Sequence, residues 1–237
     1  MTASPRQREL PELPPLIHQA VLDPLLEEEA LNNICDAARL LGFGGLCTSL
    51  CHLEAVRNRI GPSGRLRLFA VVDFPFGTIP AELKRAQAEW AAARGADALD
   101  VVPNLAAITA GRAEAYAEEL AQICDLGLPV TVILDVNRLQ PERLSLAVEA
   151  AIDAGAAFLQ AGNGFGAATT PLQVRKLKEL ARGNCAIKAA GGIQRLETAL
   201  DLVEEGATAL GTSHGPALIQ ALRHPQCARN GGSKDWL

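Results

Sequence analysis

One phrase recurs along the 237-residue chain. A helix-like segment ends in glycine, a small or apolar residue follows, and a short aliphatic run comes next. The phrase occurs as LLGFGGLCTS (40–49), ARGADALDVV (93–102), DAGAAFLQAG (153–162) and EEGATALGTS (204–213). Glycine just past a helix end adopts the left-handed cap conformation at little cost, and so short an apolar run is typical of a buried strand. The repeat therefore predicts helices that alternate with buried strands.

About eight strands follow from this pattern, each succeeded by a helix. They are expected at residues 16–22, 44–49, 66–73, 98–102, 129–135, 158–162, 185–190 and 207–213. Strict strand–helix alternation without hairpin signals implies parallel strands with right-handed crossovers. Eight such units in this length are typical of a single-domain (β/α)8 TIM barrel. A doubly wound open sheet is the alternative, but no Gly-x-Gly-x-x-Gly turn follows the first strand to support a dinucleotide site.

The barrel is expected to span residues 16–222, between a flexible N-terminal segment (1–15) and a C-terminal tail (223–237). The chain is 49% hydrophobic and 21% charged, which is typical of a soluble globular protein, and its net charge of −5 disfavours nucleic acid as a partner. No secretory signal is visible, and no apolar run approaches the ~20 residues that span a bilayer. We therefore expect a cytoplasmic protein whose six scattered cysteines are reduced.

Polar residues are few at the carboxyl ends of the expected strands, where the active sites of such barrels lie. Two of them, Asp100 and Lys188, stand in otherwise apolar strands. Burial disfavours the charged form of a lysine and makes its amine nucleophilic or basic. We expect the two side chains to pair across the barrel mouth, either as catalytic groups or as a structural ion pair. His18, Asp135 and Asn163 are expected to complete the pocket.

Two glycine-rich turns follow the expected seventh and eighth strands, AAGGI (189–193) and GTSHG (211–215). Such turns expose backbone N–H groups in front of helix N-termini, and this is the usual phosphate position of the barrel fold. The residues expected to hold a phosphate are Gly191, Gly192, Thr212, Ser213 and His214. The alternative is that these glycines only make tight strand-to-helix turns.

These motifs resemble the deoxyribose-phosphate aldolase family over nearly all of residues 16–222. AVVDFPFG (70–77) is similar to the family's VVGFPLG, GADALDVVPN (95–104) to GADEIDMVIN, VILDVNRL (132–139) to VILETGLL, and AIKAAGGI (186–193) to VKASGGI, while GTSHG (211–215) matches its phosphate turn. The resemblance implies a (β/α)8 enzyme that uses no metal or other cofactor. It also implies cleavage of 2-deoxyribose 5-phosphate to glyceraldehyde 3-phosphate and acetaldehyde.

The same resemblance places a glutamine at the family's reacting position. The family's strand-6 lysine, in the motif FIKTSTGF, forms a Schiff base with the carbonyl carbon of the substrate. Its strand-4 aspartate and strand-7 lysine, which match Asp100 and Lys188, handle protons and lower the pKa of the first lysine. Aligned on FLQAGNGF (158–165), the Schiff-base position is Gln160. An amide nitrogen is conjugated to its carbonyl and cannot add to an aldehyde, so the covalent step is expected to be lost.

Three hypotheses about function follow. In the favoured one, the barrel has lost aldolase chemistry and acts as a binding or regulatory protein that holds a phosphorylated small molecule. In the second, Lys188 takes over as the Schiff-base residue of a class I lyase, although a lysine beside Asp100 with no second cation should be a poor nucleophile. In the third, Asp100, Lys188 and His18 perform non-covalent acid–base chemistry. No membrane partner is expected, whereas a homo-oligomer or a protein partner remains an alternative.

Overall fold

Eight parallel strands close into a barrel in chain order, with β1 paired to β8, in the computed structural model, which describes residues 12–224. The strands are β1 (Ile17–Val21), β2 (Gly45–Thr48), β3 (Arg67–Val72), β4 (Ala98–Val101), β5 (Val130–Leu134), β6 (Phe158–Ala161), β7 (Ala186–Ala190) and β8 (Ala209–Thr212). Each begins and ends within two residues of its predicted position. The (β/α)8 barrel is confirmed, and the open-sheet alternative is wrong because β1 and β8 pair. The segments predicted at 1–15 and 223–237 lie almost wholly outside the described residues.

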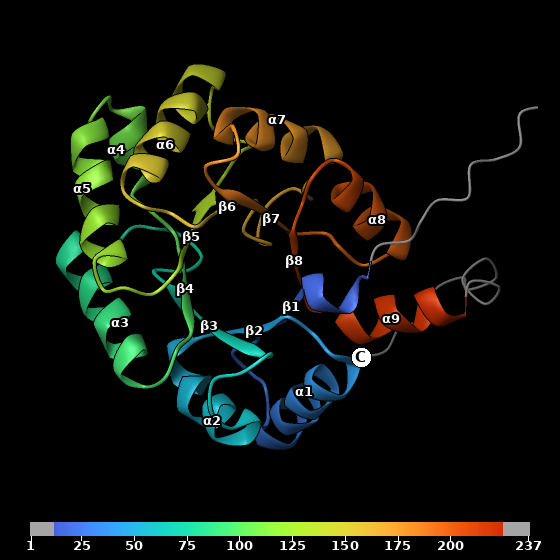
Figure 1. Cartoon of the computed structure of the whole chain (residues 1–237). Coiled ribbons are helices and arrows are strands. Elements are labelled where there is room, and N and C mark those ends of the chain that lie inside the picture. The colour runs from blue at the N-terminus through green and yellow to red at the C-terminus, as the bar shows by residue number, and fades with distance from the viewer. Residues whose placement is uncertain (1–11, 225–237) are drawn as a thin grey trace, which may run out of the picture.

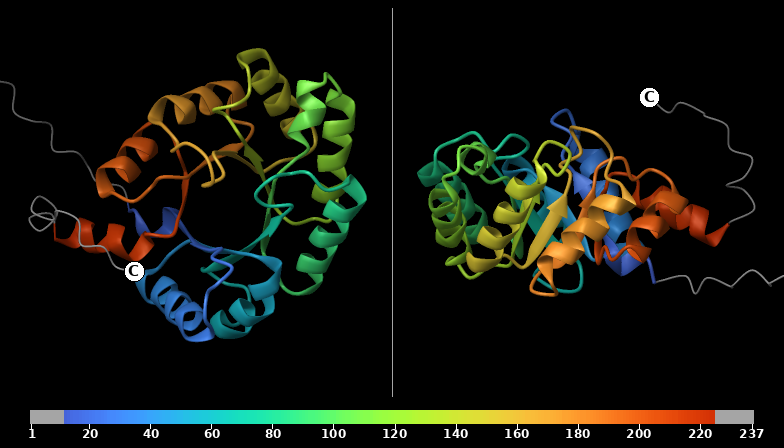
Figure 2. Two further views of the ribbon diagram at one scale, coloured as in Figure 1. Left: turned by 180° about the vertical axis from the view of Figure 1, so that it is seen from behind. Right: turned by 90° about the horizontal axis from the view of Figure 1, so that it is seen from above.

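Helices surround the strands as an outer ring (Figures 1 and 2). They are the 3-10 helix η1 (Pro14–Leu16), α1 (Glu28–Leu41), α2 (Leu50–Ile60), α3 (Ala81–Ala93), α4 (Leu105–Thr109), α5 (Ala113–Cys124), α6 (Pro141–Asp153), α7 (Pro171–Ala181), α8 (Leu196–Glu204) and α9 (Gly215–Arg223). Gly42 ends α1 with a φ of 75°, as the repeated phrase predicts. Thr170 and Gln173 form a capping box at the start of α7.

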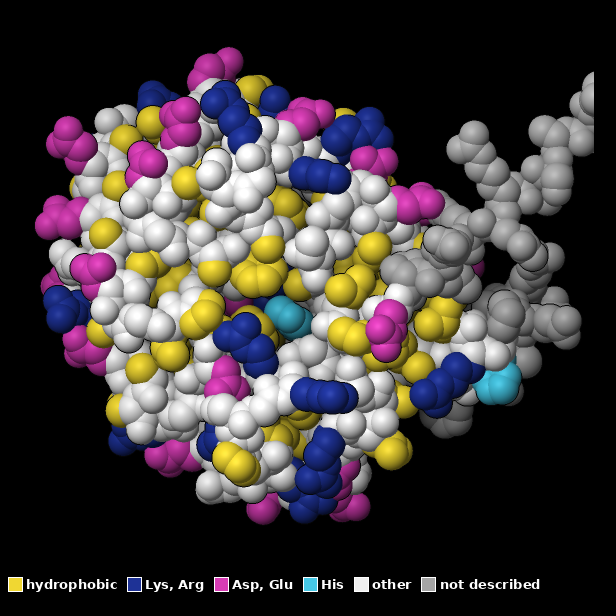
Figure 3. All heavy atoms as spheres, in the orientation of Figure 1, with side chains coloured by type: hydrophobic (Ala, Val, Ile, Leu, Met, Phe, Trp, Pro, Cys, Tyr) yellow, Lys and Arg dark blue, Asp and Glu magenta, His cyan; other side chains and the backbone are white. Residues whose placement is uncertain are grey.

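Charged side chains of both signs are spread over the face drawn in Figure 3, and hydrophobic side chains, a histidine and a Lys or Arg side chain lie near its centre. Neither sign of charge gathers into a patch on this face. No helix among residues 12–224 is long and apolar enough to cross a membrane.

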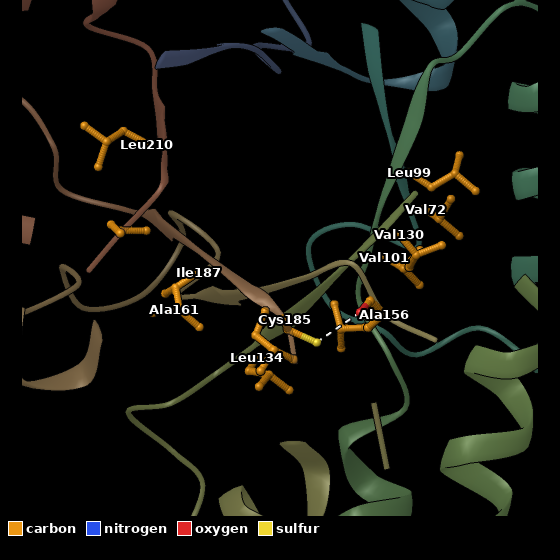
Figure 4. Packing of buried hydrophobic residues seen from close by; sticks show 14 of the residues in the cluster. Val72, Leu99, Val101, Val130, Leu134, Ala156, Ala161, Cys185, Ile187 and Leu210 are labelled. Atoms are coloured by element: carbon orange, nitrogen blue, oxygen red, sulfur yellow. Dashed lines mark hydrogen bonds between the residues drawn. The ribbon is translucent and has the colours of Figure 1, made fainter. Parts of the chain in front are cut away.

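The main core lies between the outer faces of the strands and the helices (Figure 4). It is built from aliphatic strand residues that include Val72, Leu99, Val101, Val130, Leu134, Ala161, Ile187 and Leu210. Cys185 joins this core, and its thiol donates to the Ala156 carbonyl oxygen at 3.0 Å. The five cysteines among the described residues are all free, and Cys227 lies outside them.

Alternation along the strands decides which side chains face the inside of the barrel, since successive residues of a strand point to opposite faces. In β4, Leu99 and Val101 belong to the outer core, so Asp100 between them points inward. Gln160 and Lys188 hold the equivalent inward positions in β6 and β7, and they are directly paired in the register of these two strands. The fold therefore brings three predicted site residues to one level of the barrel interior.

A second buried charge cluster lies outside the barrel, beneath the loop that joins β3 to α3. The Nζ atom of Lys84 is 2.8 Å from Oε1 of Glu119 on α5 and 3.3 Å from Oδ2 of Asp73. It also donates to the Val102 carbonyl oxygen at 3.1 Å, and the same oxygen of Asp73 accepts from the Ile79 N–H. Lys84 is fully buried. This cluster anchors the β3–α3 loop to both α3 and α5.

Replacing Lys84 with methionine should strongly destabilise the protein, because it leaves the carboxylates of Asp73 and Glu119 buried without a cation. We expect the free energy of unfolding to fall by about 3–5 kcal/mol. The matched control is Arg85→Met, which removes the next cation on α3, where an exposed pair with Glu89 should contribute less than about 1 kcal/mol. Urea denaturation followed by circular dichroism measures both changes, and similar small losses in the two variants would contradict a structural role for Lys84.

Candidate active site

A cavity of about 640 Å³ opens at the carboxyl ends of the strands. Its wall is formed by inward side chains of the barrel and by the loops that follow β1, β3, β6, β7 and β8. The predicted site residues that line it are His18, Asp100, Gln160, Asn163, Lys188, Gly191, Gly192, Thr212, Ser213 and His214. Only Asp135 among the predicted residues lies outside it.

An ion pair between Lys188 and Asp100 crosses the cavity floor. Nζ of Lys188 donates to Oδ2 of Asp100 at 2.5 Å, and both side chains are buried. Burial alone would raise the pKa of Asp100, but the Lys188 ammonium and the hydrogen bonds to the carboxylate together hold that pKa below its ordinary value. Asp100 is therefore a carboxylate at neutral pH.

Cys47 is a member of the site that was not among the residues predicted from the sequence. Its thiol donates to the same Oδ2 atom of Asp100 at 3.1 Å. Burial, followed by the nearby Asp100 charge, raises the pKa of Cys47 well above its ordinary value, so the group stays a protonated donor. The alternation of inward and outward side chains along β2 could have indicated this position, since Cys47 lies between the outward residues Leu46 and Thr48.

His18 is an uncharged member of the site. Its ring packs on Phe69 with the two ring centroids 4.2 Å apart. Burial, and then repulsion by the Lys188 ammonium, lowers the pKa of His18 from 6.5 to about 3. The imidazole is therefore neutral at physiological pH.

Gln160 is buried beside Lys188 and takes part in a single local hydrogen bond. Its Nε2 donates to the Gly162 carbonyl oxygen at 2.9 Å. A carbonyl oxygen only accepts, so this bond fixes the orientation of the amide and turns Oε1 away from Gly162. Oε1 has no partner among the described residues of the protein.

The two glycine-rich turns form one rim of the cavity. Gly191 and Gly192 have φ values of 97° and 74°, a conformation that glycine adopts most readily. The Thr212 hydroxyl donates to the Ile193 carbonyl oxygen at 2.6 Å, and this bond ties the second turn to the first. The Thr212 side chain is therefore committed to the loops, whereas the exposed Ser213 side chain remains at the rim.

Gln19 supports the second turn from β1. Its Nε2 donates to the Ser213 carbonyl oxygen at 2.9 Å, and its Oε1 accepts from the Gly215 N–H at 3.0 Å. The hydroxyl of Ser213 lies 3.1 Å from Nδ1 of His214. The turn is thus held at both of its ends, and the exposed residues Ser213 and His214 line the cavity rim.

Asp135 does not reach the cavity, in contrast to the sequence-based expectation. Strand β5 ends at Leu134, and the Asp135 carbonyl oxygen accepts from the N–H groups of Arg138 and Leu139. The chain has therefore turned before alternation could direct the Asp135 side chain inward. Its carboxylate lies 3.4 Å from the Arg138 guanidinium instead.

Asn163 lines the cavity, but its side chain joins two loops. Its Nδ2 donates to the Pro75 carbonyl oxygen at 3.2 Å, and its Oδ1 accepts from the Phe165 N–H at 3.0 Å. Nearby, the rings of Phe74 and Phe165 meet edge to face with centroids 5.5 Å apart. These contacts connect the β3–α3 loop to the β6–α7 loop across one side of the mouth.

The fold and the site together define an aldolase-like (β/α)8 barrel. No protein-family model matches the chain. The deoxyribose-phosphate aldolase of Trichormus variabilis is 36% identical over 216 residues, which cover 91% of this chain and 95% of that one. The chain therefore belongs to the deoxyribose-phosphate aldolase family, as its motifs predicted.

Solved structures agree with this assignment. The aldolase QR15 superposes with a TM-score of 0.85 at 30% identity, over 92% of this chain and 99% of that one. The deoxyribose phosphate aldolase of Aeropyrum pernix, described as having a unique tetrameric structure, gives a TM-score of 0.81 at 29% identity, over 89% and 91% of the two chains.

The buried neutral His18 should make the protein sensitive to acid. The unfolded chain binds a proton at this residue near pH 6.5, whereas the folded protein does so only near pH 3. Stability that is present above pH 6.5 is therefore lost as the pH falls toward 3, by about 1.4 kcal/mol per pH unit. Between pH 7 and 4.5, the free energy of unfolding of the protein should fall by about 3 kcal/mol more than that of the His18→Asn variant. Urea denaturation at several pH values tests this, and parallel pH profiles would contradict it.

Proposed function

We propose that this member of the family binds a phosphorylated small molecule in the barrel cavity without forming a covalent intermediate, and that it acts as a binding or regulatory protein. The observation that carries the proposal is Gln160. It occupies the strand position that the family motif gives to the Schiff-base lysine, and its side chain faces the cavity. An amide cannot form the iminium that serves as the electron sink in this chemistry.

The ion pair on the cavity floor supports the same proposal. Lys188 points at Asp100, and a lysine amine acts as a nucleophile only in its uncharged form. Burial of Lys188 favours that form, but the Asp100 carboxylate opposes it, and neither His18 nor Gln160 adds a positive charge beside it. Lys188 and Asp100 together therefore form a stable, electrically balanced pair.

The phosphorylated class of ligand is inferred from two features. The relatives are named for an aldolase that acts on deoxyribose phosphate, a phosphorylated sugar. The two glycine-rich turns lie at the cavity rim before α8 and α9, where backbone N–H groups of the first turn and the Ser213 hydroxyl can approach an anion. The phosphate is expected at this rim, with the remainder of the molecule in the cavity.

An active class I lyase that works through Lys188 is the second candidate. One observation favours it: Lys188 is the only lysine that lines this cavity within residues 12–224. Such an enzyme would cleave 2-deoxyribose 5-phosphate or a related phosphosugar. The two candidates can be told apart by one intermediate, because only the lyase forms an iminium on Lys188.

Borohydride trapping separates the two candidates. The protein is incubated with acetaldehyde or with 2-deoxyribose 5-phosphate, reduced, and mapped by peptide mass spectrometry. We expect no adduct on Lys188, and a stoichiometric adduct on the new amine in the Gln160→Lys variant, because the added lysine has no carboxylate of its own. A stoichiometric adduct on Lys188 of the unchanged protein would establish the lyase and overturn the proposal.

A phosphate at the rim should respond to added negative charge. Ser213→Asp places a carboxylate beside the expected phosphate and should weaken the binding of inorganic phosphate about tenfold or more through like-charge repulsion. Thr78→Asp is the matched control, because it adds the same charge on the exposed β3–α3 loop outside the cavity wall. Isothermal titration calorimetry at constant ionic strength measures both. Equal affinities in the two variants would place the phosphate elsewhere.

A further inference from the structure

Three buried polar atoms on the cavity floor have no hydrogen-bond partner within the described protein. They are Nδ1 of His18, Oδ1 of Asp100 and Oε1 of Gln160. Their residues are 7%, 1% and 4% exposed, and all three line the cavity. Among residues 12–224 the only other buried side-chain atom of this kind is the Tyr116 hydroxyl, which is not part of the cavity wall. Unpartnered polar atoms are therefore concentrated at one place.

Two of these atoms can only accept a hydrogen bond. The bond from Nε2 of Gln160 to the Gly162 carbonyl oxygen fixes the amide, so Oε1 is the acceptor that remains. Lys188 and Cys47 both donate to Oδ2 of Asp100, which leaves Oδ1 of the same carboxylate without a donor. The third atom, Nδ1 of His18, accepts or donates according to its tautomer.

A molecule that fills this floor must supply hydrogen-bond donors. Water can satisfy such acceptors in the free protein, but a ligand that displaces it without replacing the bonds loses affinity. An aldehyde or ketone oxygen only accepts hydrogen bonds, and an alkyl group neither donates nor accepts them. An ammonium group could donate, but it would lie close to the Lys188 ammonium. Amide N–H groups can donate but not accept, whereas a hydroxyl group can donate to these acceptors and also accept from Lys188.

We infer that the cavity selects the hydroxylated end of a phosphorylated polyol or sugar, with hydroxyl groups that donate to Oε1 of Gln160 and Oδ1 of Asp100. This inference rests on the proposed function and assigns the chemistry of the ligand at the end opposite its phosphate. It makes residue 160 a residue that determines specificity. It also gives Gln160 a positive role, because a lysine at the same position would present a donor where the glutamine presents an acceptor.

The test compares three five-carbon phosphate monoesters by isothermal titration calorimetry. Ribitol 5-phosphate carries four free hydroxyl groups, 2-deoxyribose 5-phosphate carries two, and n-pentyl phosphate has none. We expect ribitol 5-phosphate to bind about tenfold or more tightly than n-pentyl phosphate, since two buried acceptors remain unpaired with the alkyl chain. The affinity of 2-deoxyribose 5-phosphate should lie between the two.

Two variants identify the acceptor. Gln160→Leu keeps a similar volume but removes Oε1, so the preference for ribitol 5-phosphate should fall to about threefold or less. The control is Ile133→Val, because Ile133 lines the same cavity beside Gln160 in the register of β5 and β6 but carries no polar group. Its preference should not change. Because both ligands are measured on the same folded variant, a general loss of stability does not alter the ratio.

Each outcome decides one of the two proposals. If none of the three esters binds, the proposed function fails and the inference fails with it. If n-pentyl phosphate binds as tightly as ribitol 5-phosphate, phosphate binding stands and the inference is overturned. If the preference is present but survives unchanged in Gln160→Leu, the role given to Gln160 is wrong.

Discussion

A closed barrel of parallel strands turns only every second side chain of each strand toward its interior, and the site depends on this constraint. Asp100, Gln160 and Lys188 come from three strands, and each lies between outward aliphatic neighbours that pack against the helices. The same aliphatic residues that stabilise the barrel therefore fix the direction of the polar ones. A shift of one residue in the register of any of these strands would turn the polar side chains outward and the aliphatic ones inward. Packing outside the barrel therefore maintains the arrangement of polar residues inside it.

Charge balance explains why an amide fits at position 160. At the level of Gln160, the Lys188 ammonium pairs with the Asp100 carboxylate, while burial keeps His18 and Cys47 uncharged. A second buried cation at this level would have no carboxylate of its own and would act on the pKa of its neighbours. Gln160 adds no charge beside the Lys188–Asp100 pair, so that pair stays balanced. That balance suits a site that holds a ligand, because no group is forced into a reactive protonation state.

The sequence predicted the fold closely because its signals are local. Glycines past helix ends and short apolar runs mark each strand–helix boundary, and alternation then identifies the inward residues. Contacts between distant residues could not be predicted. Lys84 looks like a solvated helix residue in the sequence, yet it meets Glu119, which lies 35 residues away, and Cys47 meets Asp100 across 53 residues. Asp135 was misplaced for a related reason, since the chain turns one residue before the strand could direct it inward.

The Lys84 cluster has a consequence for how the cavity opens. It anchors the β3–α3 loop, and that loop is joined through Asn163 and the pair Phe74–Phe165 to the β6–α7 loop. One side of the mouth is thus a continuous wall fastened to the helical shell. The opposite side of the cavity is bordered by the loop after β1. A charge buried outside the barrel therefore contributes both to the packing of the helices and to the position of one side of the cavity mouth.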